Sequence, residues 1–179
     1  MLVTDAARAI FSSPRFAVRR VEIRAEPILA KELAKRLRLR PGTNLALANT
    51  GGIARAVAAV PQVKSVRVYR HWPDRITVEA EARQAAAVSR AGESAVFYDA
   101  EGRPFPVPGC WGWELPELAG PGLGATPANS EGVRPAARQL LSCLRVLREQ
   151  AKTRPRRLRL DSQGRITAEL QNRVEVRLG

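Results

Sequence analysis

The order of local patterns in the first half of the chain is the feature that most limits its fold. An extended segment at 16–24 is followed by two helical patterns and then by two further extended segments. Within the first segment, the apolar residues change parity between Val18 and Val21. A strand there must carry a bulge at Arg19-Arg20, or its first apolar pair precedes the strand.

Both helices follow from apolar residues repeated at helical spacing. A helix is predicted over 27–37, because leucines recur there at every fourth position on one face. A second helix is predicted over 50–60, with Asn49 or Thr50 as its cap and Pro61 at its end.

Two more strands complete this unit. Apolar and polar residues alternate over 63–70 and again over 75–81, and Trp72-Pro73-Asp74 supplies the turn between them. We therefore predict two helices on one face of a three-stranded sheet. This order of elements resembles the POTRA fold, whose exposed edge strand can offer its backbone to an extended partner.

The second half of the chain has the pattern of a β-rich unit with one long helix. A Pro-rich loop is expected over 104–127, and an amphipathic helix over 135–150. The other predicted elements are strands at 85–89 and 94–98, a turn at 99–102, and a meander at 158–160, 166–170 and 174–178. The predicted fold class is α+β: a POTRA domain (β-α-α-β-β) over 13–85, then a β-rich domain with one long helix over 86–179.

The chain is strongly basic, with 30 lysines and arginines against 17 acidic residues and a net charge of +13. Two basic blocks, 1–90 and 134–179, flank an acidic stretch. Only four of the basic residues are lysines, and the rest are arginines. A GC-rich coding sequence alone can produce such an excess of arginine. Attraction to an anionic membrane surface is the next interpretation. Nucleic acid comes last, because aromatic residues make up only 5% and no zinc-finger, RNP or Gly-x-x-Gly motif accompanies the charge.

Residues suited to catalysis are few. His71 is the only histidine, which excludes a two-histidine metal site, and its place beside a turn indicates a surface residue. Glu79 and Glu81 share one strand face, for which solvation is the simpler interpretation. The glycines of 120–124 form a loop, because no Gly-Lys-Ser/Thr follows them. We expect no enzymatic activity, no metal, no cofactor and no small-molecule substrate.

The remaining candidate functional residues are two cysteines and one arginine-rich run. Cys110 and Cys143 allow a single disulfide in an oxidising compartment or two free thiols, and the place of Cys143 beside an apolar helical stripe favours free thiols. The arginines of 154–160 alternate into a strand, where one exposed face could meet an acidic partner.

Seven short segments carry a resemblance to a known family. In order, they resemble successive signatures of the bacterial cell-division family FtsQ/DivIB. They are residues 16–23, 41–45, 61–68, 72–78, 96–105, 115–120 and 174–179. The Trp-Pro-Asp turn followed by the Asp-x-x-Gly turn is the strongest pair, and the resemblance covers nearly the whole chain from Ser13.

The resemblance implies a non-enzymatic divisome scaffold. Such a protein is held in the cytoplasmic membrane by one span, with its bulk on the periplasmic side. It recruits and regulates septal peptidoglycan synthesis through FtsB-like and FtsL-like partners. This chain departs from the family at 83–87, where the usual proline is absent, and at both ends, which are shorter. We expect an extracytoplasmic piece, with Met1–Phe11 as the trailing end of the span.

Two other classes of protein stay open at this stage. A POTRA-bearing component of outer-membrane assembly or secretion would need further POTRA repeats or a downstream barrel. A basic RNA-binding protein would lose its affinity steeply as salt rises.

The terminal strand is the predicted partner-binding site. Its alternation places every second residue toward the core and leaves an open sheet edge for an added strand. The core-facing residues are Val174, Val176 and Leu178, and the outward-facing ones are Arg173, Glu175 and Arg177. We expect the missing family strands to leave this edge exposed, so that the piece binds an FtsB-like partner weakly and self-associates.

Limited proteolysis tests the division into two domains, which the change of pattern near 84–88 predicts. We expect the first cuts in 120–132, which is rich in glycine, proline and small residues, and survival of a core spanning about 13–85. Degradation of both halves together from the start would contradict the two-domain organisation.

Overall fold

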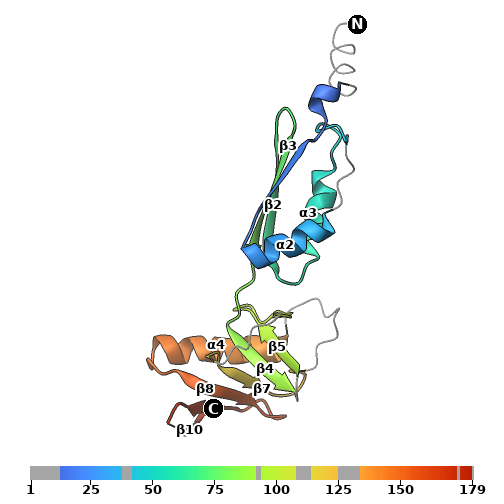
Figure 1. Ribbon diagram of the computed structural model, residues 1–179. Helices are drawn as coiled ribbons and strands as arrows, with labels where there is room; N and C mark the ends of the chain where they lie inside the picture. The colour runs from blue at the N-terminus through green and yellow to red at the C-terminus, as the bar shows by residue number, and fades with distance from the viewer. Residues whose placement is uncertain are drawn as a thin grey trace, which may run out of the picture. The chain divides into compact units, whose positions relative to one another are not determined.

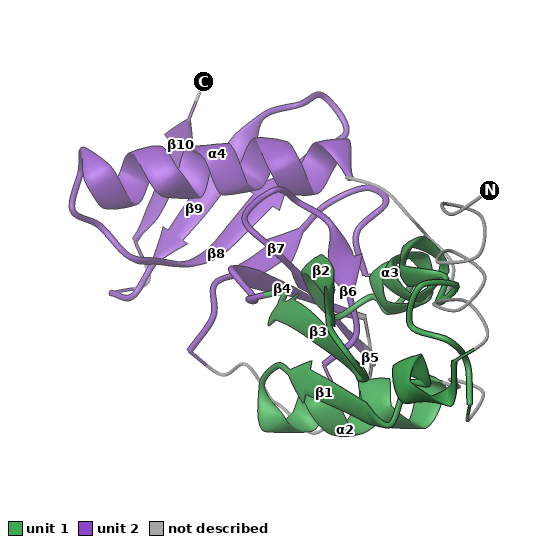
Figure 2. Cartoon of the chain, turned by 90° about the horizontal axis from the view of Figure 1, so that it is seen from above, with its two compact units in different colours: residues 1–83 green, residues 84–179 purple. Residues whose placement is uncertain are grey.

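A computed structural model describes most of the chain. The described residues are 13–37, 42–91, 94–107, 114–124, 134–172 and 174–178. The chain forms two compact units, unit 1 over 1–83 and unit 2 over 84–179 (Figure 2). Whether each unit folds independently stays a prediction for proteolysis.

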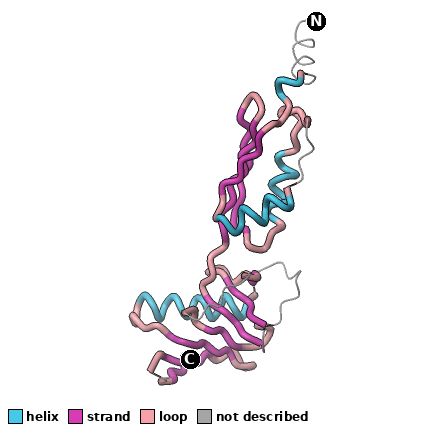
Figure 3. The backbone as a smooth tube through the Cα atoms, in the orientation of Figure 1, coloured by secondary structure: helices cyan, strands magenta, loops and turns pink. Residues whose placement is uncertain are grey.

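Unit 1 has the predicted β-α-α-β-β order after one short helical turn. Its elements are η1 (Pro14–Phe16), β1 (Arg20–Arg24), α2 (Pro27–Arg36), α3 (Thr50–Ala58), β2 (Val63–His71) and β3 (Arg75–Ala82). The sheet order is β1-β3-β2, with β3 parallel to β1 and antiparallel to β2. Both helices lie on one face of the sheet (Figures 1 and 3). The α+β fold class predicted from the sequence is confirmed.

Apolar residues at helical and strand spacing meet in the core of unit 1. Leu33 on α2 and Val57 on α3 are fully buried, and they join Ile76 and Val78 from the central strand β3 in one cluster. The side chain of Asn49 accepts a hydrogen bond from Gly52 N at 2.8 Å, which caps α3 at the predicted position.

The first strand is shorter than the predicted 16–24 segment. Phe16 ends η1, whose N-cap is Ser13, and the strand begins only at Arg20. Between η1 and β1 the chain is held by the turn that joins β2 to β3. The backbone N–H groups of Arg19 and Arg20 both donate to Asp74 O in that turn, at 2.9 and 3.2 Å. Of the two alternatives left open by the sequence, the apolar pair precedes the strand.

Unit 2 is a seven-stranded mixed sheet with one helix. Its strands are β4 (Ala87–Ala91), β5 (Ser94–Tyr98), β6 (Pro104–Phe105), β7 (Glu117–Ala119), β8 (Pro155–Leu160), β9 (Ile166–Leu170) and β10 (Glu175–Leu178). The helix is α4 (Pro135–Glu149), which lies across one face of the sheet (Figure 2). The sheet order is β10-β9-β8-β7-β4-β5-β6. The predicted long helix and terminal meander are thereby confirmed.

The predicted Pro-rich loop over 104–127 contains two strands. β7 sits inside the sheet, where it pairs in parallel with β4 on one side and with β8 on the other. Leu118 at its centre is fully buried. The prediction of a plain loop is wrong here because a three-residue strand has too little alternation to show in the sequence, and its partners lie far away in the chain.

Gly102 brings the turn after β5 against the start of α4. It has a φ of +81°, and a Cβ built on it would lie 2.9 Å from the backbone N of Arg138. Its carbonyl accepts a hydrogen bond from Arg134 N at 2.9 Å. Both the left-handed conformation and the close approach therefore require glycine.

Replacing Gly102 by alanine tests this contact. We expect Gly102→Ala to lower the free energy of unfolding by about 2 to 4 kcal/mol, because it adds a steric clash to the cost of a left-handed φ. Gly164→Ala is the matched control, since Gly164 has the same φ of +81° and nothing within 4 Å of its Cβ position. Urea unfolding should show a loss of only about 1 kcal/mol for the control. Equal losses would show that the close approach is unimportant.

Candidate partner-binding interface

β10 forms one edge of the unit 2 sheet. It pairs antiparallel with β9, with Glu175 opposite Glu169 and Leu178 opposite Ile166. Within the described part of the chain, β9 is its one neighbour in the sheet. Among the described residues the opposite side of β10 is unpaired, and unpaired backbone N–H and C=O groups are what an added strand binds.

The structure places five of the six predicted site residues. Leu178 is half-buried and packs against the core beneath α4, and Val176 is also half-buried. Glu175 and Arg177 are exposed, as their outward parity predicts. Arg173 lies outside the described residues.

The prediction that Val174 faces the core is wrong. Its side chain is 48% exposed, and the strand begins only at the next residue. Val174 belongs to the turn instead, where its N–H donates to Asn172 Oδ1 at 3.3 Å and its carbonyl accepts from Leu170 N at 2.9 Å. Alternation continues across a turn in the sequence, but the backbone there no longer follows the pleat of the strand.

The other edge of this sheet is poorly suited to strand addition. β6 has two residues and begins with Pro104, which has no backbone N–H. β10 has four residues and no proline. Of the two edges, β10 offers the longer backbone ladder.

Charged side chains line the face of the sheet opposite α4. Arg157 on β8 and Glu117 on β7 form an ion pair at 2.9 Å. Arg157 is also opposite Glu169 in register, and Glu169 is opposite Glu175 on β10. Two glutamates directly opposite each other repel, and neither has an ion-pair partner among the described residues, so β10 ends this charged row on an acidic position.

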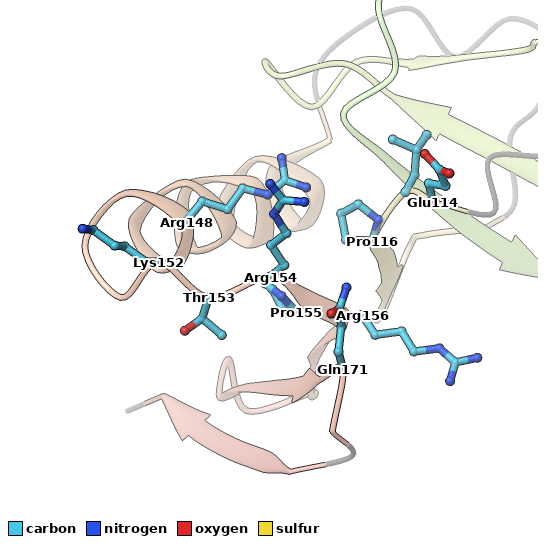
Figure 4. A pocket seen from close by; sticks show the side chains of 10 residues that line it. Glu114, Pro116, Arg148, Lys152, Thr153, Arg154, Pro155, Arg156 and Gln171 are labelled. Atoms are coloured by element: carbon cyan, nitrogen blue, oxygen red, sulfur yellow. The ribbon is translucent and has the colours of Figure 1, made fainter.

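A basic groove lies where α4 ends and β8 begins. Its volume is about 1040 Å³, and the turn between β9 and β10 contributes to its wall (Figure 4). The polar residues that line it are Glu114, Arg148, Lys152, Thr153, Arg154, Arg156 and Gln171.

Positive charge dominates this groove. Among the residues that the structure describes, Arg148, Lys152, Arg154 and Arg156 have no ion-pair partner, and Glu114 is the one acidic residue in the lining. The sequence indicated the arginines of 154–160, but it gave no sign that the end of α4 would lie beside them. The only local signal was the spacing of four between Arg148 and Lys152.

The turn between β8 and β9 is stabilised by a charged residue. Asp161 accepts hydrogen bonds from the backbone of Gln163 and Arg165, and Arg165 Nε donates to its Oδ2 at 2.7 Å. The Arg165 guanidinium holds the pKa of the Asp161 carboxyl below its ordinary value. Because the folded-state pKa is lowered, this contribution is present near neutral pH and is lost as acid protonates the carboxyl.

The other candidate residues lie away from this interface. In the structure, Cys143 has a free thiol on α4, and burial raises its pKa. Cys110 lies outside the described residues, so the state of the pair stays a prediction. His71 is exposed at the end of β2. No group of three or more metal-ligating side chains comes together in the described ranges.

The two glutamates of β3 belong to a network of ion pairs on the solvent face of unit 1. Arg24 contacts Glu79 at 3.4 Å, and Lys64 contacts Glu81 at 3.3 Å. A hydrogen bond from the Ser65 hydroxyl is the main cause that lowers the pKa of Glu81, and Lys64 adds to it. Paired and exposed in this way, they fit the solvated face predicted for them.

Comparison with known proteins identifies the class of unit 1. Residues 16–81 match the family of POTRA domains of the FtsQ type, so this part of the chain is an FtsQ-type POTRA domain. Over 176 residues the chain is 32% identical to the Cell division protein FtsQ of Myxococcus fulvus (strain ATCC BAA-855 / HW-1), covering 94% of this chain and 60% of that protein. The chain therefore spans about three fifths of the length of this FtsQ relative, and the similarity agrees with the resemblance that its sequence motifs indicated.

A solved structure also overlaps part of the chain. It contains POTRA domains 1 and 2 of the periplasmic domain of Omp85 from Anabaena, with a TM-score of 0.35 and 16% identity over 46% of this chain and 58% of that one. An overlap this low assigns neither fold nor function.

Proposed function

We propose that this chain is the extracytoplasmic part of a non-enzymatic divisome scaffold. The similarity to an FtsQ protein and the FtsQ-type POTRA domain support a role in cell division. The chain would recruit and regulate septal peptidoglycan synthesis through protein contacts, while a membrane span holds it at the cytoplasmic membrane. Among the described residues, no helix is long and apolar enough to cross a membrane.

The open edge of β10 is the observation that carries this proposal. A partner segment in extended conformation adds beside β10 and pairs with its backbone. Leu178 packs against the core and β9 pairs along the strand, so the edge is ordered before the partner arrives. Ordering the edge in advance lowers the entropic cost of binding.

Charge near β10 defines the chemistry of the partner. A basic side chain on the added strand would compensate Glu175, which already faces Glu169 across the ladder. An acidic stretch next to that strand would enter the groove formed by Arg148, Lys152, Arg154 and Arg156. We assign this partner to the FtsB-like and FtsL-like class of divisome proteins.

The alternative as an outer-membrane assembly component is less well supported. The family match over 16–81 is to POTRA domains of the FtsQ type, and the curated relative is a cell division protein. The second unit presents the sheet edge described above.

Proline and alanine substitutions in β10 test the proposed mode of binding. Successive N–H groups of a strand point to opposite edges. One of the substitutions Val176→Pro and Arg177→Pro therefore removes a donor that points away from β9, and the other removes a donor that points toward β9. We expect both proline variants to bind the extracytoplasmic segment of an FtsB-like partner at least about tenfold more weakly in a pull-down or titration. Val176→Ala and Arg177→Ala are the matched controls, because each retains its N–H.

The same titration tests the groove with a charge reversal. Arg156→Glu should weaken binding about fivefold, and Lys31→Glu on α2 should leave it unchanged. Circular dichroism and urea unfolding confirm that each variant is folded. Binding by the proline variants as tight as that of the unaltered chain would show that β10 is not the site and would favour the nine-residue edge strand β2.

A further inference from the structure

One end of unit 1 combines exposed apolar side chains with arginines. There, η1 lies beside the turn between β2 and β3 (Figure 1). The loop before α3 is tied to the η1 segment, because Leu45 N donates to Phe16 O at 2.7 Å and Val18 N donates to Thr43 O at 2.9 Å. It is tied to β2 as well, because Arg70 Nη2 donates to Ala48 O at 2.7 Å. We call residues 13–20, 42–48 and 70–75 the tip.

An aromatic pair stands at the centre of the tip. The rings of Phe16 and Trp72 are in edge contact, with centroids 5.3 Å apart and an interplanar angle of 83°. Trp72 is still 55% exposed, and Leu47 in the neighbouring loop is 64% exposed. Large apolar side chains exposed together on a tied backbone indicate a surface that contacts something else.

The charge of the tip is almost entirely positive. It contains five arginines and a single acidic residue, Asp74. Asp74 is already paired with Arg20 at 3.3 Å, and its side chain is only 15% exposed. Within the described residues, Arg15 and Arg19 are exposed and have no ion-pair partner, so they are available to an external anion.

The backbone of the tip is held in place by its own hydrogen bonds. The N–H groups of Arg19 and Arg20 converge on Asp74 O, and Ala17 bridges Asn44. The backbone positions that carry the aromatic pair and Arg15 and Arg19 are therefore fixed relative to each other. A surface on a fixed backbone needs less reorganisation to bind.

We propose that the tip docks on the surface of an anionic phospholipid bilayer. Tryptophan and phenylalanine enter the interfacial region, and arginines beside them bind lipid phosphates, which is the combination found at membrane–water interfaces. The sequence favours lipid over a protein partner, because the tip directly follows the mostly apolar segment Met1–Phe11. This inference goes beyond the scaffold role and does not depend on it, since vesicle binding and partner binding can each fail alone.

Vesicle binding by the chain tests the docking. The probe is a vesicle of phosphatidylcholine containing about one third phosphatidylglycerol, compared with phosphatidylcholine alone. In a Trp111→Phe/Trp113→Phe background, the emission of Trp72 should shift to the blue with the anionic vesicles only. Trp72→Ala should weaken binding to them about tenfold, the equivalent of one large apolar side chain.

Arginine substitutions form the second part of the vesicle-binding experiment. Arg15→Gln/Arg19→Gln should weaken binding about 25-fold, at about fivefold for each charge near an anionic surface. Two controls match these changes: Tyr69→Ala, which removes another exposed aromatic on β2, and Arg145→Gln/Arg159→Gln, which removes two exposed arginines of unit 2. Thermal unfolding verifies that all variants are folded.

The outcomes separate clearly. Loss of binding in the tip variants and retention in both controls support the docking. Equal losses in tip and control variants would show that binding follows overall charge, and an unshifted Trp72 emission would show that the tip stays in water. Either result overturns the proposal.

Discussion

The packing of α4 against β8 and β9 is the contact on which the proposed interface depends. Leu140 and Leu144 of the helix are buried in one cluster with Leu158 and Ala168 of the strands. This contact sets the end of the helix beside the start of β8, and so forms the basic groove. β9 pairs with β8, and among the described residues β10 is held by its pairing with β9 and by the partial burial of Leu178. The sheet edge and the groove therefore share one structural origin.

Arginine has different roles in different parts of the fold. On the solvent face of unit 1, Arg24 is bound by the carboxylates of Glu22 and Glu79. In the groove, and at Arg15 and Arg19 of the tip, the arginines have no such partners among the described residues. A net charge of +13 therefore does not describe the molecule well, because what matters for recognition is where the charge is left unpaired. The groove fits an acidic protein segment, and the tip, with its aromatic pair, fits a lipid surface.

The sequence predicted the elements whose signal is local. The leucines of α2, the Asn49 cap and the position of β3 each depend on a few neighbouring residues, and all three were placed correctly, although Thr77 on the polar side of β3 is buried. β7 was missed, because a three-residue strand is defined by its neighbours β4 and β8. Val174 was misplaced, because alternation alone does not show where a turn ends. The groove required the end of α4 to meet β8, a contact that only the folded chain contains.

Hydrogen–deuterium exchange of the chain, alone and with the extracytoplasmic segment of an FtsB-like partner, tests the central claim most directly. Strand addition converts exposed backbone donors into bonded ones, so the amides of β10 should exchange more slowly in the complex. The amides of the opposite edge strand β6 should be unaffected. Unchanged exchange in β10, with new protection in β2 of unit 1, would contradict the account.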